Sequence, residues 1–373
     1  MRALIDATAV PVDRGGVGRY VDNLIPALVR VGVEVRAVCQ LREREHYARL
    51  SSREPVTVSR VVERRPVRLA WEQSGLVRAA KLIGADVVHS PHYTHPLLSR
   101  IPQVVTLHDA TFFTDPEVHA RLKVRFFRLA IRLALTRADC CVVASQASAD
   151  ALVAVAGADP DQLQVAHLGV DTAVFAPPTA AAVGAVRERL GLREGQSWVA
   201  FLGTLEPRKN LGSLIRGWVA AVRDRVDPPA LVLAGGSGWD DSLDAASAAV
   251  PAGLTLLRPG YLPLELLAGL LGGAVVVAYP SLGEGFGLPV LEAMACGAPV
   301  LTTRKLALPE VGGDAVAYTD TDAASIADAL RNLLDDAGWR TRLGAAGLAR
   351  AAGFTWEACA AAHVRAFERA LAA

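Results

Sequence analysis

The feature that most constrains the fold is an alternation of short apolar runs and longer amphipathic segments. In the first half the runs are rich in valine and leucine, and they read RALID, VEVRAV, ADVVHS, PQVVTLHD and DCCVVAS. Such runs lack polar alternation, which is typical of parallel strands buried on both faces. Between them we expect helices at about 16–31, 70–84, 118–137 and 145–156. This half therefore predicts a doubly wound α/β sheet.

The second half repeats the pattern with the runs SWVAFLG, ALVLAGG, LTLLRPG, AVVVAYPS and APVLTT. Its helices are expected near 209–226, 239–249, 263–271, 289–296, 323–335 and 339–352. A chain of 373 residues exceeds the roughly 150 residues of one average domain. We predict two Rossmann-like domains, 1–178 and 179–355, joined at the prolines of FAPPTAAAV, with an amphipathic last helix at 356–373. Ligands are then expected in an interdomain cleft, at the carboxyl ends of the strands.

Composition excludes several classes of protein. With 52% hydrophobic residues and a net charge of +1, the chain is neither disordered nor a generally basic nucleic-acid binder. Five cysteines without a CxxC pair favour reduced thiols in the cytoplasm over a disulfide framework or a zinc site. The start, MRALIDATAV, lacks the apolar region of a signal peptide, and no apolar run reaches the roughly 18 residues of a membrane span. We expect a cytoplasmic protein with, at most, a peripheral membrane contact.

One loop carries an unusual pair of acids. In SLGEGFGLPVLE, which follows the run AVVVAYPS, Glu284 and Glu292 lie eight positions apart around a glycine-rich loop. Glycines permit close approach of a ligand, and Pro289 suits the first position of a helix. Backbone amides at the positive end of that helix would then face a phosphate or sugar hydroxyls. These amides belong to Gly285, Phe286, Gly287 and Leu288.

The spacing of the two glutamates argues against a glycosidase pair. Eight residues of continuous helix span roughly 12 Å, whereas the acid and base of a glycosidase lie about 5 to 9.5 Å apart. We interpret Glu284 and Glu292 as clamps on the two ends of one elongated ligand, such as a nucleotide sugar. The alternative for Glu292 is the general preference of a helix N-terminus for acidic residues.

The string EGFGLPVLE resembles the E-x7-E signature of retaining glycosyltransferases of family 4, which have the GT-B fold, and the agreement extends over essentially the whole chain. The resemblance implies metal-independent transfer of a hexose from a nucleoside diphosphate sugar to a hydroxyl acceptor. GDP-mannose is slightly preferred, because members with GTLEPRKN-type strings often include mannosyltransferases. In such proteins the last helix commonly crosses back to the N-terminal, acceptor-side domain.

The resemblance also assigns site residues. In FLGTLEPRKN it implies that Arg208 and Lys209 neutralise the leaving diphosphate. Thr204 stands where many members have arginine, so Arg208 is expected to take the place of that arginine. In VVTLHDATFF it places His108 beside the transferred sugar, while Asp109 orients loops or binds acceptor. The alternative is a His-Asp pair that only caps the next loop.

Other glycines match the segments that surround the donor in this family. DRGGVGRY resembles the first glycine loop, where Gly15 and Gly16 would face the donor phosphates. VLAGGSG and RPGYLP resemble segments around the nucleotide, which assigns Gly235 and Leu262 to donor binding. Tyr261, between them, is equally consistent with a core aromatic residue.

Three histidines in HSPHYTHP raise the question of a metal. His89, His92 and His95 are three residues apart, but two prolines place them in a loop without thiols or a helical HExxH pattern. We prefer an acceptor-side loop that includes His92, and no metal.

The predicted helix 118–137 has no acidic residue and one stripe of cations at a spacing of four, three and four, Arg121, Arg125, Arg128 and Arg132. Lys123 and Arg137 add to its charge. This pattern is compatible with anionic lipid headgroups or a phosphorylated lipid acceptor. A solvated helix face over the core is the alternative.

Three other functions remain open at this stage. A GT-B sugar-nucleotide epimerase would react without an acceptor, and a catalytically silent protein would only bind the nucleotide sugar. An NAD-dependent oxidoreductase is disfavoured, because no G-x-G-x-x-G with a ribose-binding acid follows the first strand.

Overall fold

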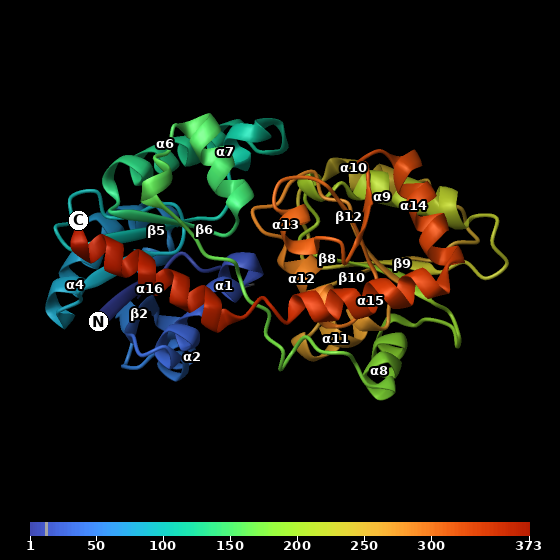
Figure 1. The fold of residues 1–373 in the computed structure, drawn as a ribbon, viewed down its shortest axis with the longest axis horizontal. Helices are drawn as coiled ribbons and strands as arrows, with labels where there is room; N and C mark the ends of the chain where they lie inside the picture. The colour runs from blue at the N-terminus through green and yellow to red at the C-terminus, as the bar shows by residue number, and fades with distance from the viewer. Residues whose placement is uncertain (12–13) are drawn as a thin grey trace. The chain divides into compact units, whose positions relative to one another are not determined.

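The computed structural model describes residues 1–11 and 14–373, and the chain divides into two compact units. The first comprises Met1–Gly169 and Thr355–Ala373, and the second Val170–Phe354. Figure 1 shows helices on both faces of the sheet in each unit. The first unit ends at Gly169, whereas the predicted boundary is at residue 178. The prolines behind that expectation belong to the second unit, where Pro178 packs against Gly272.

The described part of the first unit contains a parallel sheet of seven strands in the order β3-β2-β1-β4-β5-β6-β7. Because β1 pairs with both β2 and β4, the strand order reverses between β1 and β4, and Leu4 lies opposite Arg36 on one side and Val88 on the other. The strands are β1 Arg2–Asp6, β2 Glu34–Gln40, β3 Val56–Val58, β4 Val87–Ser90, β5 Gln103–Leu107, β6 Cys140–Val143 and β7 Leu163–Val165.

The helices of the first unit cover this sheet. They are α1 Gly15–Arg30, α2 Arg44–Leu50, α3 Arg65–Trp71, α4 Val77–Ile83, α5 Thr111–Thr114, α6 Arg121–Arg137, α7 Gln146–Ala156 and α16 Trp356–Ala372. The helix expected at 70–84 is interrupted, because a π-helical turn, Glu72–Leu76, connects α3 to α4. A π-helical turn inside a helix is rare, and such turns occur frequently at functional sites.

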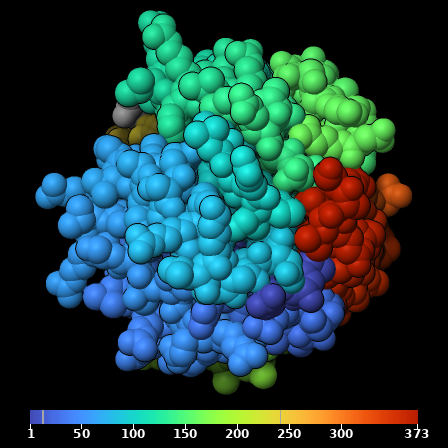
Figure 2. Space-filling view, turned by 90° about the vertical axis from the view of Figure 1, so that its left-hand side faces the viewer, coloured from blue at the N-terminus to red at the C-terminus, as the bar shows by residue number. Residues whose placement is uncertain are grey.

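The last helix, α16, belongs to the first unit although it follows the whole second unit in the sequence. It packs on α1 and on strands β4 to β7. At its centre the buried Tyr20 hydroxyl donates to His363 Nε2 at 2.6 Å and lies 2.8 Å from Thr106 Oγ1. Figure 2 shows the surface of α16, in red, beside the green segment near residue 160. Arg369 fixes this edge by donating to the Asp161 carbonyl at 2.7 Å.

The second unit contains a parallel sheet of six strands in the order β10-β9-β8-β11-β12-β13. Here the order reverses between β8 and β11. The strands are β8 Trp198–Leu202, β9 Ala230–Ala234, β10 Leu256–Gly260, β11 Val276–Tyr279, β12 Val300–Thr303 and β13 Ala317–Thr319. The helices are α8 Ala180–Leu190, α9 Leu211–Val222, α10 Asp241–Ala248, α11 Leu264–Gly272, α12 Leu288–Ala295, α13 Leu308–Gly312, α14 Ala323–Asp335 and α15 Ala337–Ala351.

The ten predicted strands all form, and three short strands were missed. The missed strands β3, β7 and β13 each have three residues and stand at an edge of their sheet. The helices α2, α5, α8 and α13 were not predicted; they have seven, four, eleven and five residues. Only the last two residues of α3 fall within the predicted helix 70–84.

The five cysteines are free and buried in the structure. Among residues 1–11 and 14–373, no helix is both long enough and apolar enough to cross a membrane.

Candidate active site

The loops that follow β8 and β11 bring the predicted basic pair to one of the predicted glutamates. Arg208 and Lys209 lie in the short turn Pro207–Lys209 after β8, and Glu284 lies in the loop after β11. The two loops are joined by the Leu282 amide, which donates to the Arg208 carbonyl at 2.8 Å. Since β8 and β11 flank the reversal point of the second sheet, the cluster occupies the place where open α/β sheets bind ligands.

Glu284 is the centre of this cluster. Its Oε1 accepts from Lys209 Nζ at 2.6 Å and from Ser281 Oγ at 2.6 Å, and its Oε2 accepts from Arg208 Nη1 at 2.5 Å. Burial opposes ionisation of the carboxyl, but Arg208 and Lys209 outweigh it and lower the pKa of Glu284 to about 2. The side chain is therefore a carboxylate at neutral pH.

The two cations are held in place by further partners. Lys209 Nζ donates to the Tyr279 hydroxyl at 2.5 Å, and Arg208 Nη2 donates to Glu206 Oε1 at 2.7 Å. Burial, and then the neighbouring Arg208, lower the pKa of Lys209, while Glu284 and Glu206 favour its charged form. Burial, followed by Glu284, raises the pKa of Tyr279, so this phenol stays protonated. The result is a fixed pair of cations whose charge is balanced by two carboxylates.

The glycine-rich loop continues directly into α12. Gly287 has φ 105°, a left-handed conformation that favours glycine, and an added Cβ would lie 2.9 Å from Leu308. The helix begins at Leu288, so Pro289 is its second residue. Phe286 is buried and its ring packs edge-on against Phe354, with centroids 5.9 Å apart. The Phe286 side chain therefore supports the loop.

Glu292 lies within α12, is buried, and is separated from the Glu284 cluster by the loop and the first turn of the helix. The two glutamates thus occupy different surroundings. Glu284 forms ion pairs with both Arg208 and Lys209. The sequence predicts these two cations as partners of the diphosphate, not of Glu284.

The glycine at the end of β9 is required by the backbone that faces it. At Gly235, φ is 139° and an added Cβ would lie 2.0 Å from the Gly203 carbonyl oxygen. Tyr261 has 54% of its surface exposed, so the alternative of a core aromatic residue is wrong. Its ring packs instead over Gly236, where an added Cβ would lie 2.6 Å from the Tyr261 hydroxyl. Leu262 is half-buried beside it.

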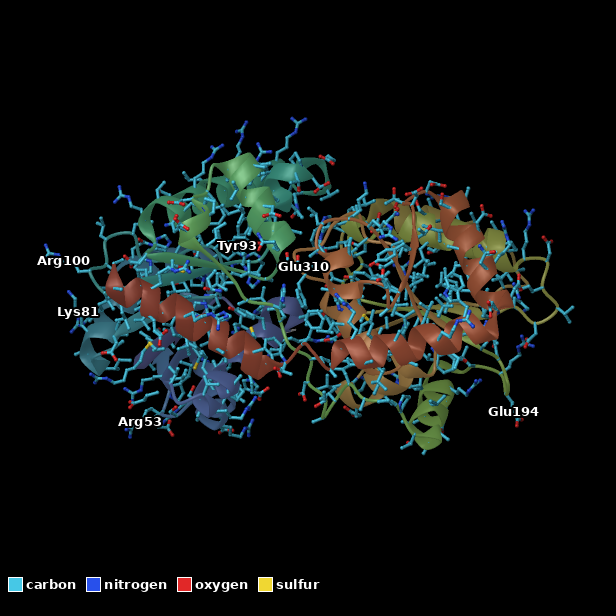
Figure 3. All side chains as sticks on the ribbon, in the orientation of Figure 1. Arg53, Lys81, Tyr93, Arg100, Glu194 and Glu310 are labelled. Carbon is cyan, nitrogen blue, oxygen red and sulfur yellow. The ribbon has the colours of Figure 1, made fainter. Side chains whose placement is uncertain are left out.

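In the first unit, His108 follows β5 and is half-buried. Its Nε2 donates to the Pro91 carbonyl at 2.7 Å, and burial lowers its pKa. A neutral ring that donates through Nε2 leaves Nδ1 as a hydrogen-bond acceptor. The rings of Tyr20 and Tyr93 stand edge-on to it, with centroids 5.4 and 5.6 Å away. Tyr93, labelled in Figure 3, has a left-handed backbone with φ 57°.

Two further predicted residues, Asp109 and His92, lie near His108. Asp109 Oδ1 accepts from the Thr111 amide at 3.0 Å and from its hydroxyl at 2.7 Å, at the start of α5. Asp109 thus orients the loop after β5. The His92 ring lies 6.1 Å from the His108 ring, and burial and His108 lower the pKa of His92 to about 3.

The other two histidines of the HSPHYTHP segment, His89 and His95, are buried. His89 is buried in β4, with Nε2 2.8 Å from Thr106 Oγ1, and His95 is buried further along the loop. In the part of the chain that the structure describes, no three His, Cys, Asp or Glu side chains gather as a metal site.

The two glycines of the predicted first loop, Gly15 and Gly16, are the first residues of α1, and the space beside them is open. Arg14 has φ 59° and Gly15 φ 51°, and an added Cβ at Gly15 or Gly16 would meet nothing within 4 Å. Arg14 shapes this loop by binding Glu43 and by lying 3.4 Å from Asp22. Residue 13, the first of the string DRGGVGRY, and residue 12 before it lie outside the described residues.

Sequence reasoning missed the residues that complete the Glu284 cluster. Tyr279 and Ser281 belong to the quoted run AVVVAYPS, and Glu206 stands two residues before Arg208. Their signal was proximity to strand ends, where polar side chains on adjacent parallel strands meet.

Two doubly wound units in tandem are the architecture of the GT-B fold, and solved glycosyltransferase structures share it. Anabaena HepE, in complex with UDP and glucose, superposes with a TM-score of 0.76 at 19% identity, over 98% of both chains. WaaG, a glycosyltransferase involved in lipopolysaccharide biosynthesis, gives a TM-score of 0.74 at 16% identity, over 98% of this chain and 99% of its own.

The sequence identifies the family within this class. The model of Glycosyltransferase Family 4 matches residues 14–174, and that of Glycosyl transferases group 1 matches residues 184–350. The O-antigen chain mannosyltransferase B of Escherichia coli is 31% identical over 85% of this chain and 81% of its own. A D-inositol 3-phosphate glycosyltransferase of Mycobacteroides abscessus is 29% identical over 96% and 86%. The chain belongs to glycosyltransferase family 4.

Proposed function

We propose that the protein is a retaining hexosyltransferase, with a slight preference for mannose, that uses a nucleoside diphosphate sugar and a hydroxyl acceptor. The observation that carries the proposal is the cation pair, Arg208 and Lys209, fixed by Glu284 at the reversal point of the second sheet. HepE, which shares the fold, is described with UDP and glucose, and the Escherichia coli relative is a mannosyltransferase. Both support a nucleotide sugar donor and synthesis of a glycan, polysaccharide or glycolipid.

The basic pair supplies the main electrostatic contribution in this proposal. When the bond from the sugar carbon to the diphosphate breaks, negative charge grows on the departing oxygen. Cations held in fixed positions stabilise that charge without rearrangement at the moment of reaction. The proposal assigns the leaving diphosphate to Arg208 and Lys209 and includes no metal and no cofactor.

The donor and the transferred sugar take the remaining contacts. We assign donor binding to Glu292 and to backbone groups of four segments. These segments are the start of α1, the residue after β9, the turn after β10, and the loop before α12 with the first residue of that helix. These residues are Gly15, Gly16, Gly235, Leu262, Gly285, Phe286, Gly287, Leu288 and Glu292. His108 Nδ1 accepts a hydrogen bond from a hydroxyl of the transferred sugar, and His92 and Asp109 belong to the acceptor side.

Retention follows in this proposal from a displacement on one face of the sugar. The bond between the anomeric carbon and the acceptor oxygen forms on the face that the diphosphate leaves. The acceptor proton passes to a leaving phosphate oxygen, so the departing group serves as the base. The Arg208 and Lys209 charges keep that oxygen in reach.

Calorimetric titration with GDP, UDP, ADP and dTDP tests the donor assignment. We expect selective binding of one diphosphate, GDP if the donor is GDP-mannose, and weaker binding in Lys209→Met and in Glu292→Ala. Lys81→Met is the matched control, because Lys81 is exposed on α4 (Figure 3). Folded protein that binds none of the four diphosphates would refute the donor site.

A turnover assay then separates transfer from epimerisation. A transferase releases nucleoside diphosphate only when a hydroxyl acceptor is added, whereas an epimerase reacts with the nucleotide sugar alone. Binding without any turnover, unchanged by Glu284→Ala, would indicate a silent nucleotide-sugar-binding protein.

We also propose that α6 makes a peripheral contact with the cytoplasmic face of an anionic membrane. Leu122 and Leu129 have 81% and 59% of their surfaces exposed, and Arg121, Arg125 and Arg132 are exposed around them. The fourth residue of the predicted stripe, Arg128, instead donates to the Phe112 carbonyl at 2.7 Å. Apolar side chains flanked by cations are typical of helices that lie at a membrane surface.

Flotation with phosphatidylglycerol vesicles tests this contact. We expect binding that falls as salt rises and is lost in Leu122→Ser/Leu129→Ser. Leu98→Ser is the control, because Leu98 is 86% exposed outside α6. Equal binding to neutral phosphatidylcholine vesicles, or no loss in the double variant, would contradict the proposal.

A further inference from the structure

A chain of buried hydrogen bonds crosses the first unit next to His108. It connects side chains from four elements, His89 of β4, Thr106 of β5, Tyr20 of α1 and His363 of α16, and all four are buried. Thr106 Oγ1 lies 2.8 Å from His89 Nε2 and 2.8 Å from the Tyr20 hydroxyl. That hydroxyl lies 2.6 Å from His363 Nε2. Hydrogen bonds in such a chain strengthen one another, because each bond polarises the next.

The titratable groups of this chain are uncharged at neutral pH. Burial lowers the pKa of His363 to about 4. Burial and then His363 hold the pKa of His89 well below its usual range. Burial and then Cys359 raise the pKa of Tyr20 well above its usual value, so the phenol keeps its proton. Each imidazole therefore has one nitrogen that donates and one that accepts.

The two ends of the chain fix the direction of its hydrogen bonds. At one end His363 Nδ1 lies 2.8 Å from the Cys359 carbonyl, which can only accept, so Nδ1 donates and Nε2 accepts from Tyr20. The Tyr20 oxygen then accepts from Thr106, which accepts from His89 Nε2. At the other end, His89 Nδ1 has no hydrogen-bond partner among the described residues. A proton there would be an orphaned buried donor, which is rare, so both ends give the same direction.

Tyr20 is the residue of this chain that orients the ring of His108. A single hydrogen bond, from His108 Nε2 to the Pro91 carbonyl, places one atom of the imidazole, but the plane of the ring depends on neighbouring side chains. The Tyr20 ring stands edge-on to it, at an interplanar angle of 89°, and the Tyr93 ring at 71°. Edge-on contacts between aromatic rings favour a defined orientation, so the two tyrosines restrict the turning of the imidazole.

Tyr20 is itself anchored at both of its hydroxyl contacts. Thr106 lies in β5 two residues before His108, which is the spacing of side chains on one face of a strand. His363 lies inside α16 and bonds to the preceding turn of its own helix at the Cys359 carbonyl. Tyr20 thus connects the strand that carries His108 to the helix with which the chain returns from the second unit.

We propose that Tyr20 is a positioning residue for His108, and that Thr106 of β5 and His363 of α16 hold it in this role. The inference rests on the proposed function, in which His108 Nδ1 accepts a hydrogen bond from a hydroxyl of the transferred sugar. The anchored Tyr20 ring keeps the lone pair of that nitrogen in one direction. An acceptor that is oriented before the sugar arrives loses less conformational freedom on binding.

Calorimetric titration of the full chain separates the contact with the sugar from the contact with the diphosphate. The probes are GDP-mannose with GDP and UDP-glucose with UDP. We expect Tyr20→Phe, which removes only the hydroxyl, to weaken binding of the nucleotide sugar about two- to tenfold, the range for one hydrogen bond. Affinity for the corresponding diphosphate should stay the same. Tyr318→Phe is the matched control and should change neither affinity, because it removes a hydroxyl that donates to the Gly313 carbonyl at 2.8 Å in the second unit.

Two variants of His363 test the anchor on α16. His363→Gln keeps an acceptor oxygen at about the reach of Nε2, whereas His363→Leu leaves the Tyr20 hydroxyl without an acceptor. We expect affinity for the nucleotide sugar to be kept in His363→Gln and to fall in His363→Leu as far as it does in Tyr20→Phe. A merely structural role of the chain would lower the melting temperatures of Tyr20→Phe and His363→Leu without changing the ratio of the two affinities.

Two-bond proton–nitrogen NMR spectra of wild type with ¹⁵N-labelled histidine test the direction of the hydrogen bonds. This measurement needs neither a ligand nor a variant that folds. We expect His363 to carry its proton on Nδ1, and His89 and His108 to carry theirs on Nε2. The opposite tautomer at any of the three rings would overturn the inference.

The outcomes separate this inference from the proposed function. If Tyr20→Phe weakens binding of the nucleotide sugar and of its diphosphate equally, or of neither, the positioning role is wrong and the donor site stands. If His363→Gln and His363→Leu behave alike, the anchor on α16 is wrong. If wild type binds neither a nucleotide sugar nor its diphosphate, the proposed function itself is wrong, and the positioning role falls with it.

Discussion

Replacing the carboxylate of Glu284 by an amide should destabilise the second unit in a way that depends on pH. Glu284→Gln keeps the size of the side chain but leaves Arg208 and Lys209 without their shared anion. A pKa lowered from 4.5 to about 2 corresponds to about 3 kcal/mol of folding free energy at neutral pH. The side chain is only 8% exposed, so solvent screening removes little of this value.

The sign of the pH dependence follows from the direction of the pKa change. Because the folded-state pKa is lowered, the stabilisation is complete above about pH 4.5 and is lost as the pH falls toward 2. We expect the free energy of unfolding of wild type to exceed that of Glu284→Gln by about 3 kcal/mol at pH 7. This difference should narrow steadily below pH 4.5.

Urea unfolding at several pH values measures this gap. Trp198 and Trp218 are buried in the second unit, so their fluorescence reports its transition. Glu265→Gln is the control, because it makes the same chemical change at an exposed position on α11. A gap below about 1 kcal/mol at pH 7, the size expected of an exposed ion pair, would refute the reasoning. So would a gap that stays constant down to pH 2.5.

Three further predictions concern substitutions at Lys209, Glu72 and Gly235. Lys209→Met should cost about 3–5 kcal/mol in urea unfolding, and the double variant with Glu284→Gln should cost less than the sum of the single variants; strict additivity would deny coupling. Glu72 has a raised pKa of about 7, so its contribution to stability is complete below about pH 4.5 and is lost as the pH rises through 7. Glu72→Gln should therefore gain up to about 3 kcal/mol relative to wild type between pH 4 and pH 8, and a constant difference would contradict this. Gly235→Ala should destabilise by about 2 kcal/mol or more and weaken diphosphate binding, because its Cβ would meet the backbone at Gly203; Gly253→Ala, with open space around it, should change neither.

The central strands of both sheets could be predicted because burial on both faces leaves a continuous apolar run. The strands that were missed stand at the sheet edges and have three residues each. In β3 the run Val56–Val58 is interrupted by an exposed threonine, and it is too short for periodicity to distinguish it from a loop. Edge strands have fewer buried neighbours, so sequence constrains them less.

Some residues of the candidate site could be predicted from the sequence, and others could not. Glu284 was singled out by the glycine-rich loop after a strong strand pattern, and Arg208 and Lys209 by the family resemblance of a string that follows another strand. The order of the strands then brings the three side chains together. What sequence could not give was their pairing, since it depends on which strands are adjacent at the reversal point. The burial of Glu72 was not predicted, because a glutamate in a helical pattern normally indicates a solvated face. In the structure Glu72 is the first residue of the π-helical turn and is buried.

Both reversal points hold cations against a buried carboxyl group. At the second sheet, cations are held ready by carboxylates, and a diphosphate can replace part of that carboxylate contact because both are anions with oxygen acceptors. At the first sheet, Arg68 likewise binds a buried carboxyl group, with Arg68 Nη1 2.9 Å from Glu72 Oε2. The second sheet differs in holding two cations, Arg208 and Lys209, on one carboxylate, Glu284. Because a diphosphate that binds these cations must displace part of the Glu284 contact, its affinity should depend on both of them.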